Sequence, residues 1–189
     1  ALALSVIAGV DPRDATSSAR SLGDLSARDD GAARVGVPRG LLDGADERVC
    51  AAVAEAEAAL RGAGVEIVDI ELRHADAGVA AYYVIAPAEA SSNLARFDGV
   101  RYGRRAELAP GEGLEALYVK SRTEGFGAEV RRRILLGTHV LSSGYHDAYY
   151  VTAQRVRGLI KRDYDRAFAG EQGCAAALLP AAPGPAFVA

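Results

Sequence analysis

The feature that most constrains the fold of this chain is an alternation of short segments between residues 34 and 72. A β-branched run, "RVGVP" at 34–38, is stopped by proline and predicts a strand. A helical pattern follows Asp46, a suitable N-cap, and ends at Gly62. The alternating run "VEIVDIEL" at 65–72 predicts a second strand. Strand, helix and strand with short links form a βαβ unit, so the two strands are predicted to be parallel.

The rest of the chain has other patterns. Residues 11–33 are rich in Asp, Ser, Arg and Gly without periodicity, which predicts a surface loop, and "AAALLP" at 175–180 predicts a returning strand. Residues 76–168 have a helical pattern, with helices predicted at 76–95, 114–122, 127–142 and 146–168. The prediction is therefore an α/β chain, with one βαβ unit of a mixed sheet and several packed helices in a single partial domain over 1–189.

Composition excludes several classes of protein. Half of the 189 residues are hydrophobic and a quarter are charged, so the chain can bury a core. The formal net charge of −3 gives no electrostatic reason to expect nucleic-acid binding by this segment alone. Cys50 and Cys174 lie far apart and belong to no metal motif, which favours a reducing compartment over a disulfide framework. No apolar run approaches the roughly 18 residues of a membrane-spanning helix.

Arg133 is the most informative polar residue, in the run "GAEVRRRILLGTHVLSSGY" at 127–145. Each helical residue advances about 100°, so Val130, Ile134, Gly137 and Leu141 share one apolar stripe. Arg132 then points to water, whereas Arg133 falls on the apolar side. A guanidinium there either binds a ligand carboxylate through its two-donor edge, or forms a structural ion pair, or extends its head to solvent.

The other candidate residues suggest structural roles. His139 and His146 lack a carboxylate or cysteine at metal-ligand spacing. The Ser-Ser pairs at 91–92 and 142–143 lack the Gly-x-Ser-x-Gly elbow that exposes a nucleophile, so capping and close packing are expected. The basic run "RYGRR" at 101–105 is expected to be a solvated loop, with contact to tRNA as an alternative. The residues alone therefore provide an anion-binding arginine but neither a nucleophile nor a base.

Three long motifs add a resemblance to a known family. The motifs are "YYVIAPAEASSNLARFDGVRYG", "SRTEGFGAEVRRRILLGTHVLSSGYHDAYY" and "QRVRGLIKRDYDRAF". They resemble the A subunits of glutamyl-tRNA(Gln) amidotransferases, a branch of the amidase signature family, and the resemblance covers nearly the whole chain. The chain departs from the family pattern at "PAAPGPAF" (180–187), where two hydroxyl-bearing residues are lost, and at His146, where a tyrosine is usual.

The resemblance implies a glutaminase that acts in a three-subunit complex in the cytoplasm, or in the matrix or stroma of an organelle. Glutamine is hydrolysed, and the ammonia passes to the B subunit, which converts phosphate-activated Glu-tRNA(Gln) to Gln-tRNA(Gln). The B and C subunits, glutamine and tRNA (mainly through the B subunit) are the implied partners, and no membrane is involved. No cofactor is expected in this chain, since ATP and Mg are used by the B subunit.

The resemblance also assigns site residues. The family uses a Ser nucleophile, a second Ser joined through a cis peptide, and a Lys base, and none of these is found among the 189 residues, so this chain alone is expected to be inactive. By motif position, Tyr82 and Arg133 correspond to substrate-binding residues, with Arg133 holding the α-carboxylate of glutamine. Two alternatives remain: a truncated, non-catalytic homologue that serves as an assembly or binding module, and another hydrolase of the same signature family.

Overall fold

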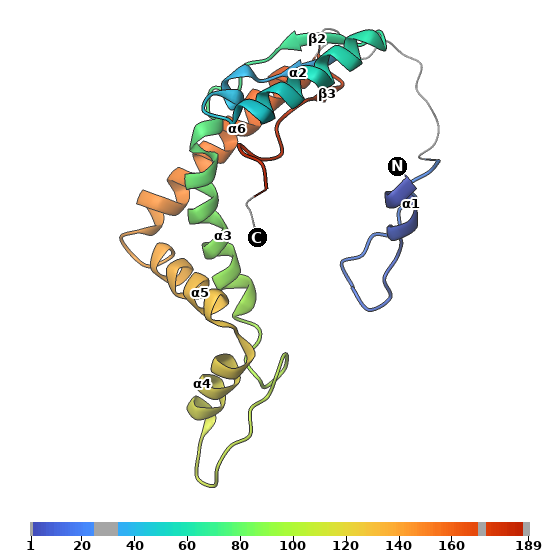
Figure 1. Ribbon diagram of the computed structural model, residues 1–189. Coiled ribbons are helices and arrows are strands. Elements are labelled where there is room, and N and C mark those ends of the chain that lie inside the picture. The colour runs from blue at the N-terminus through green and yellow to red at the C-terminus, as the bar shows by residue number, and fades with distance from the viewer. Residues whose placement is uncertain (1, 25–33, 170–172, 187–189) are drawn as a thin grey trace. The chain divides into compact units, whose positions relative to one another are not determined.

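A computed structural model of the chain describes residues 2–24, 34–169 and 173–186 (Figure 1). The chain divides into two compact units, residues 1–33 and 34–189. In the first unit, helix α1 spans Leu2–Ile7 and no helix or strand follows it up to residue 24. The remainder of the predicted loop, 25–33, lies outside the described residues.

The second unit contains a small parallel sheet. Its strands are β1 (Arg34–Val37), β2 (Glu66–Asp69) and β3 (Ala176–Ala177), in the order β2-β1-β3. Val35 of β1 lies opposite Ile67 of β2 and Ala176 of β3. The predicted α/β class, the parallel pair and the returning strand are therefore confirmed.

The middle strand is buried because it has a neighbour on each side. Val35 and Val37 are among the buried hydrophobic residues. A Cβ at Gly36 would collide with the side chains of Ile70 and Cys174, so only glycine fits between them. Helix α2 (Glu47–Gly62) follows β1 and packs against β2, with the Asp46 side chain accepting a hydrogen bond from the Arg48 N–H as the predicted N-cap.

A charged cluster joins α2 to the sheet. Arg39, in the short helix η1 (Arg39–Leu42), donates to both carboxylate oxygens of Glu57 at 2.5 and 3.0 Å. Its Nε donates to Asp69 at the end of β2, at 2.8 Å. The Glu57 side chain is only 6% exposed. The hydrogen bonds from Arg39 lower the pKa of Glu57 below its ordinary value and outweigh the effect of burial, which opposes ionisation.

Replacing Glu57 by glutamine is expected to destabilise the full-length protein by about 1–2 kcal/mol at pH 7. Because the folded-state pKa is lowered, this stabilisation is present above the unfolded-state pKa and is lost as the pH falls through the folded-state value. Chemical denaturation should therefore separate the variant from the wild type at pH 7, show the difference shrinking as the pH falls below 4.5, the ordinary pKa, and abolish it only below the lowered folded-state pKa. Glu55→Gln, at an exposed position of the same helix, is the control and should behave as wild type. A Glu57→Gln penalty that is unchanged at low pH would contradict this account.

The helical part of the second unit follows the predicted pattern, with one difference. The short helix η2 (Ala75–Ala77) leads into α3 (Gly78–Leu94), and α4 (Leu114–Gly125) and α5 (Ala128–Val140) follow. The segment predicted as one helix at 146–168 is instead a π-helical turn, η3 (His146–Val151), continued by α6 (Thr152–Phe168). The rings of Tyr145 and Tyr149 stack on the wider turn, with centroids 6.0 Å apart.

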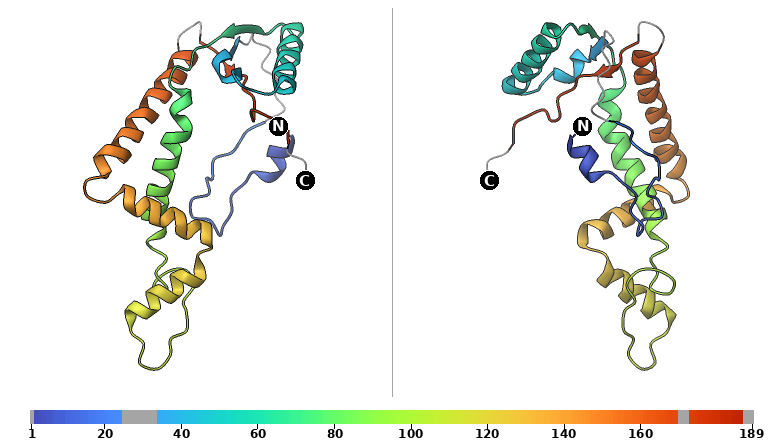
Figure 2. Two further views of the ribbon diagram at one scale, coloured as in Figure 1. Left: turned by 60° about the vertical axis from the view of Figure 1, so that its left-hand side comes forward. Right: turned by 90° about the vertical axis from the view of Figure 1, so that its right-hand side faces the viewer.

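Helices α5 and α6 both pack against α3 (Figures 1 and 2). At its N-terminal end, the buried carboxylate of Asp163 on α6 accepts hydrogen bonds from the backbone and ring nitrogens of His74, each at 2.9 Å. Further along, Gly137 of α5 lies directly on the backbone of Pro87, and the hydroxyls of Ser91 and Thr138 are 2.9 Å apart. Within the described residues, no helix has the length and apolar character needed to cross a membrane.

Candidate functional site

The candidate site begins with the orientation of α5. Val130, Ile134 and Leu141 are half-buried and Gly137 is buried, as the helical phase predicts. Arg131 and Arg132 are exposed, whereas Arg133 is half-buried on the side that faces α3. Of the three consecutive arginines, Arg133 is thus the least exposed, as its predicted position on the apolar side of the helix requires.

The crossing of α3 and α5 brings together the two residues that the resemblance singled out. Nη1 of Arg133 donates a hydrogen bond to the hydroxyl oxygen of Tyr82, with the two atoms 3.0 Å apart. These residues are 51 positions apart in the sequence. Tyr82 is 50% exposed and the Arg133 side chain 39%, so both lie at an open surface of the second unit. The rings of Tyr82 and Tyr83 pack in a T-shaped arrangement, with centroids 5.3 Å apart.

Glu129 is a third member of this cluster that the sequence analysis missed. Its Oε1 accepts a hydrogen bond from Nε of Arg133 at 2.8 Å, and its Oε2 lies 3.0 Å from Nη2 of Arg132. The spacing of four residues between Glu129 and Arg133 on one helix was the available signal. The structural ion pair left open for Arg133 therefore exists, and it coexists with the contact to Tyr82.

These contacts hold the cluster in its charged form. The hydrogen bond to Tyr82, followed by that to Glu129, raises the pKa of Arg133 further above its already high ordinary value. The hydrogen bonds from Arg133 and Arg132 lower the pKa of Glu129. Two guanidinium groups and one carboxylate give the cluster one net positive charge, which suits a ligand with a single carboxylate.

The remaining predicted residues have structural partners. The ring of His139 packs against that of Tyr145 in a tilted arrangement, with centroids 4.4 Å apart. The described residues contain no group of three or more His, Cys, Asp or Glu side chains that could hold a metal ion. The Ser142 hydroxyl donates to the carbonyl of His139 at 2.6 Å. Within the basic run, Arg104 pairs with Glu124 at 2.9 Å, and Arg105 donates to the Gly99 carbonyl at 3.1 Å.

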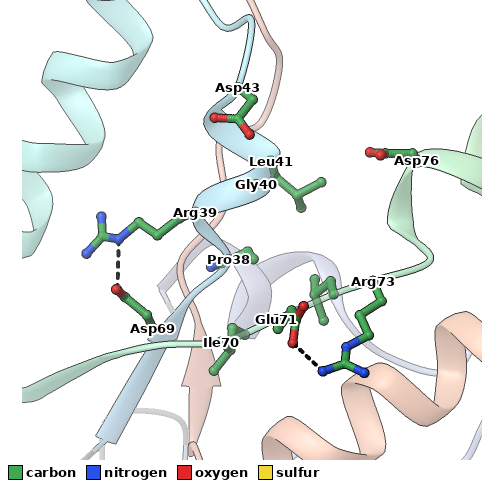
Figure 3. A pocket seen from close by; sticks show the side chains of 11 residues that line it. Pro38, Arg39, Gly40, Leu41, Asp43, Asp69, Ile70, Glu71, Arg73 and Asp76 are labelled. Carbon is green, nitrogen blue, oxygen red and sulfur yellow. Dashed lines mark hydrogen bonds and ion pairs between the residues drawn. The ribbon is translucent and has the colours of Figure 1, made fainter.

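A separate pocket of about 510 Å³, also missed by the sequence analysis, lies outside the carboxyl ends of β1 and β2 (Figure 3). This edge of a parallel sheet is a common place for ligands. Most charges in the pocket are already paired, however. Arg39 is bound to Asp69 and Glu57, and Arg73 donates to Glu71 at 2.8 Å. Asp43 and Asp76 also line it, so the pocket wall is acidic overall.

Comparison with known proteins identifies the family. All of the chain, residues 1–189, matches the Amidase family. The chain belongs to the amidase family.

Within the amidase family, the curated relatives most similar in sequence include A subunits of glutamyl-tRNA(Gln) amidotransferases. The chain is 54% identical over 191 aligned residues to the A subunit of the glutamyl-tRNA(Gln) amidotransferase of Anaeromyxobacter dehalogenans (strain 2CP-C). It is 50% identical to the protein of the same name from Cereibacter sphaeroides (strain ATCC 17025 / ATH 2.4.3). Each alignment covers 99% of this chain and 38% of the relative. The chain thus spans less than half the length of these relatives.

A solved structure gives the same assignment. The crystal structure of the glutamyl-tRNA(Gln) amidotransferase A subunit from Thermotoga maritima matches 99% of this chain and 35% of its own. The TM-score is 0.61 and the sequence identity 32%. The amidase-family fold and the resemblance to these A subunits are therefore both established.

Proposed function

We propose that this chain is part of the glutaminase subunit of a glutamyl-tRNA(Gln) amidotransferase, and that the α3–α5 pair binds the α-carboxylate of glutamine. Two named relatives and a solved neighbour carry that subunit's name, which supports the assignment of activity. The contact between Arg133 and Tyr82 is the single observation that supports the assignment of the binding residues.

The proposed binding chemistry follows from the donors that these side chains retain. Arg133 uses Nε for Glu129 and one hydrogen of Nη1 for Tyr82. Nη2 and the second hydrogen of Nη1 remain for the two oxygens of a carboxylate, the two-donor geometry that arginine favours. Because the Tyr82 hydroxyl accepts from Arg133, its own hydrogen is free to donate to the same ligand.

In this proposal, the ammonia released from glutamine passes to the partner chains of the complex. The phosphate activation of Glu-tRNA(Gln), with ATP and Mg, takes place on the B subunit, and the C subunit completes the complex. The direct test is ammonia release from glutamine, together with amidation of Glu-tRNA(Gln), by the full-length protein assembled with its partners. An assembled complex that hydrolyses another amide but not glutamine would favour a different hydrolase of the family, and one without any amide hydrolysis would favour a binding module.

Replacing Tyr82 by phenylalanine in the assembled enzyme is expected to raise the KM for glutamine about fivefold and to change kcat by less than about twofold. The substitution removes one hydrogen-bond donor to the ligand and the acceptor for Arg133, and it leaves the ring in place. Tyr83→Phe is the matched control, because Tyr83 is the neighbouring exposed tyrosine and should retain the wild-type KM. Equal values of KM in the wild type and Tyr82→Phe would remove the hydroxyl from the site.

A further inference from the structure

The guanidinium group of Arg133 is held along two different edges. Nε is bound by Glu129, one turn earlier on the same helix, and Nη1 is bound by Tyr82 from α3. One contact alone would leave the group free to rotate, because arginine has a long, flexible side chain. Two contacts from two helices fix both the position and the plane of the group, and among the described residues Nη2 has no hydrogen-bond partner.

Glu129 is itself well placed for this role. It lies in the first turn of α5, where the helix dipole favours a negative charge. Its second oxygen is bound by Arg132, so the carboxylate is held from both sides. The Glu129–Arg133 pair is half exposed, and such a pair contributes little to folding stability. Its effect is therefore expected in the orientation of Arg133 and not in the stability of the fold.

We propose that Glu129 is a positioning residue for ligand binding, which holds Nε of Arg133 so that the Nη1 and Nη2 edge is presented to a carboxylate. This inference rests on the proposed function, since it requires Arg133 to bind the glutamine α-carboxylate. A group held in its binding orientation before the ligand arrives loses less conformational entropy on binding. Because Glu129 already occupies Nε, the ligand carboxylate is directed to the terminal edge of the guanidinium.

The test uses the full-length protein assembled with its partners. Glu129→Ala is expected to raise the KM for glutamine about tenfold and to leave kcat within about twofold. Glu129→Gln retains an oxygen that can accept from Nε, so it should restore most of the loss and raise the KM only about twofold to threefold. Glu115→Ala is the matched control, because Glu115 occupies the first turn of α4 as Glu129 occupies that of α5.

A double substitution separates positioning from other effects. If Glu129 acts through Arg133, adding Glu129→Ala to Arg133→Ala should change the KM no further. A wild-type KM in Glu129→Ala, or a full tenfold effect that persists without Arg133, would overturn the positioning role. A wild-type KM in Arg133→Ala would instead overturn the proposed function, so the two failures can be distinguished.

Discussion

Replacing Gly137 by alanine is expected to destabilise the full-length protein by about 3 kcal/mol, the largest effect on stability predicted for a single methyl group in this chain. A Cβ at this position would overlap the carbonyl group of Pro87 and crowd the side chain of Ser91. The helix axes must then separate, because the obstacle is backbone and cannot rotate away. The better helix propensity of alanine offsets only about 1 kcal/mol of this cost.

Chemical denaturation measures this effect, and Gly158→Ala is its matched control. Gly158 is also within a helix, α6, but a Cβ there would meet no atom within 4 Å. The control should therefore be as stable as wild type or slightly more stable. Because the crossing also aligns Arg133 with Tyr82, Gly137→Ala should weaken glutamine binding even where the protein remains folded. Equal stability of the two alanine variants would show that α3 and α5 do not cross as described.

Replacing Arg133 by alanine in the assembled enzyme is expected to raise the KM for glutamine about a hundredfold, the largest effect on function predicted here. Under the proposed function, the change removes both donors to the ligand carboxylate. Arg133→Lys retains the charge without the two-donor edge, so it should recover only part of the loss. Arg131→Ala, two residues earlier on the exposed face of α5, is the control and should retain the wild-type KM.

Stability provides a second control for the Arg133 variants. Arg133 is half exposed and its partner Glu129 more so, and pairs of this kind contribute little to folding. The denaturation midpoint of Arg133→Ala is therefore expected to stay close to that of wild type. A variant that unfolds early would show that the arginine mainly holds α5 in place, in agreement with a purely structural ion pair.

The sequence predicted the structure best where a single local pattern determines the secondary structure or the orientation of a side chain. The β-branched run that ends at Pro38 located β1, and the helical phase of α5 separated Arg133 from Arg131 and Arg132. The π-helical turn at His146–Val151 was not predicted, because a segment of 6 residues is too short for its apolar spacing to distinguish a π-helical turn from an α-helical one.

The periodicity of the sequence does not predict contacts between segments that are far apart in the chain. The proximity of Tyr82 and Arg133 follows from the way that Gly137 packs on Pro87, and only the family resemblance had linked the two residues. The cluster of Arg39, Glu57 and Asp69 depends in the same way on how the sheet meets α2. Glu129 was different, since its spacing of four residues from Arg133 was visible in the sequence and could have been used.

The most direct test compares two substrates in the assembled enzyme, glutamine and 4-aminobutanamide, which lacks only the α-carboxylate. If Arg133 binds that carboxylate, Arg133→Ala should lower kcat/KM for glutamine about a hundredfold and leave kcat/KM for 4-aminobutanamide within about twofold of wild type. An equal loss for both substrates would contradict the account, because Arg133 would then act on something other than the carboxylate.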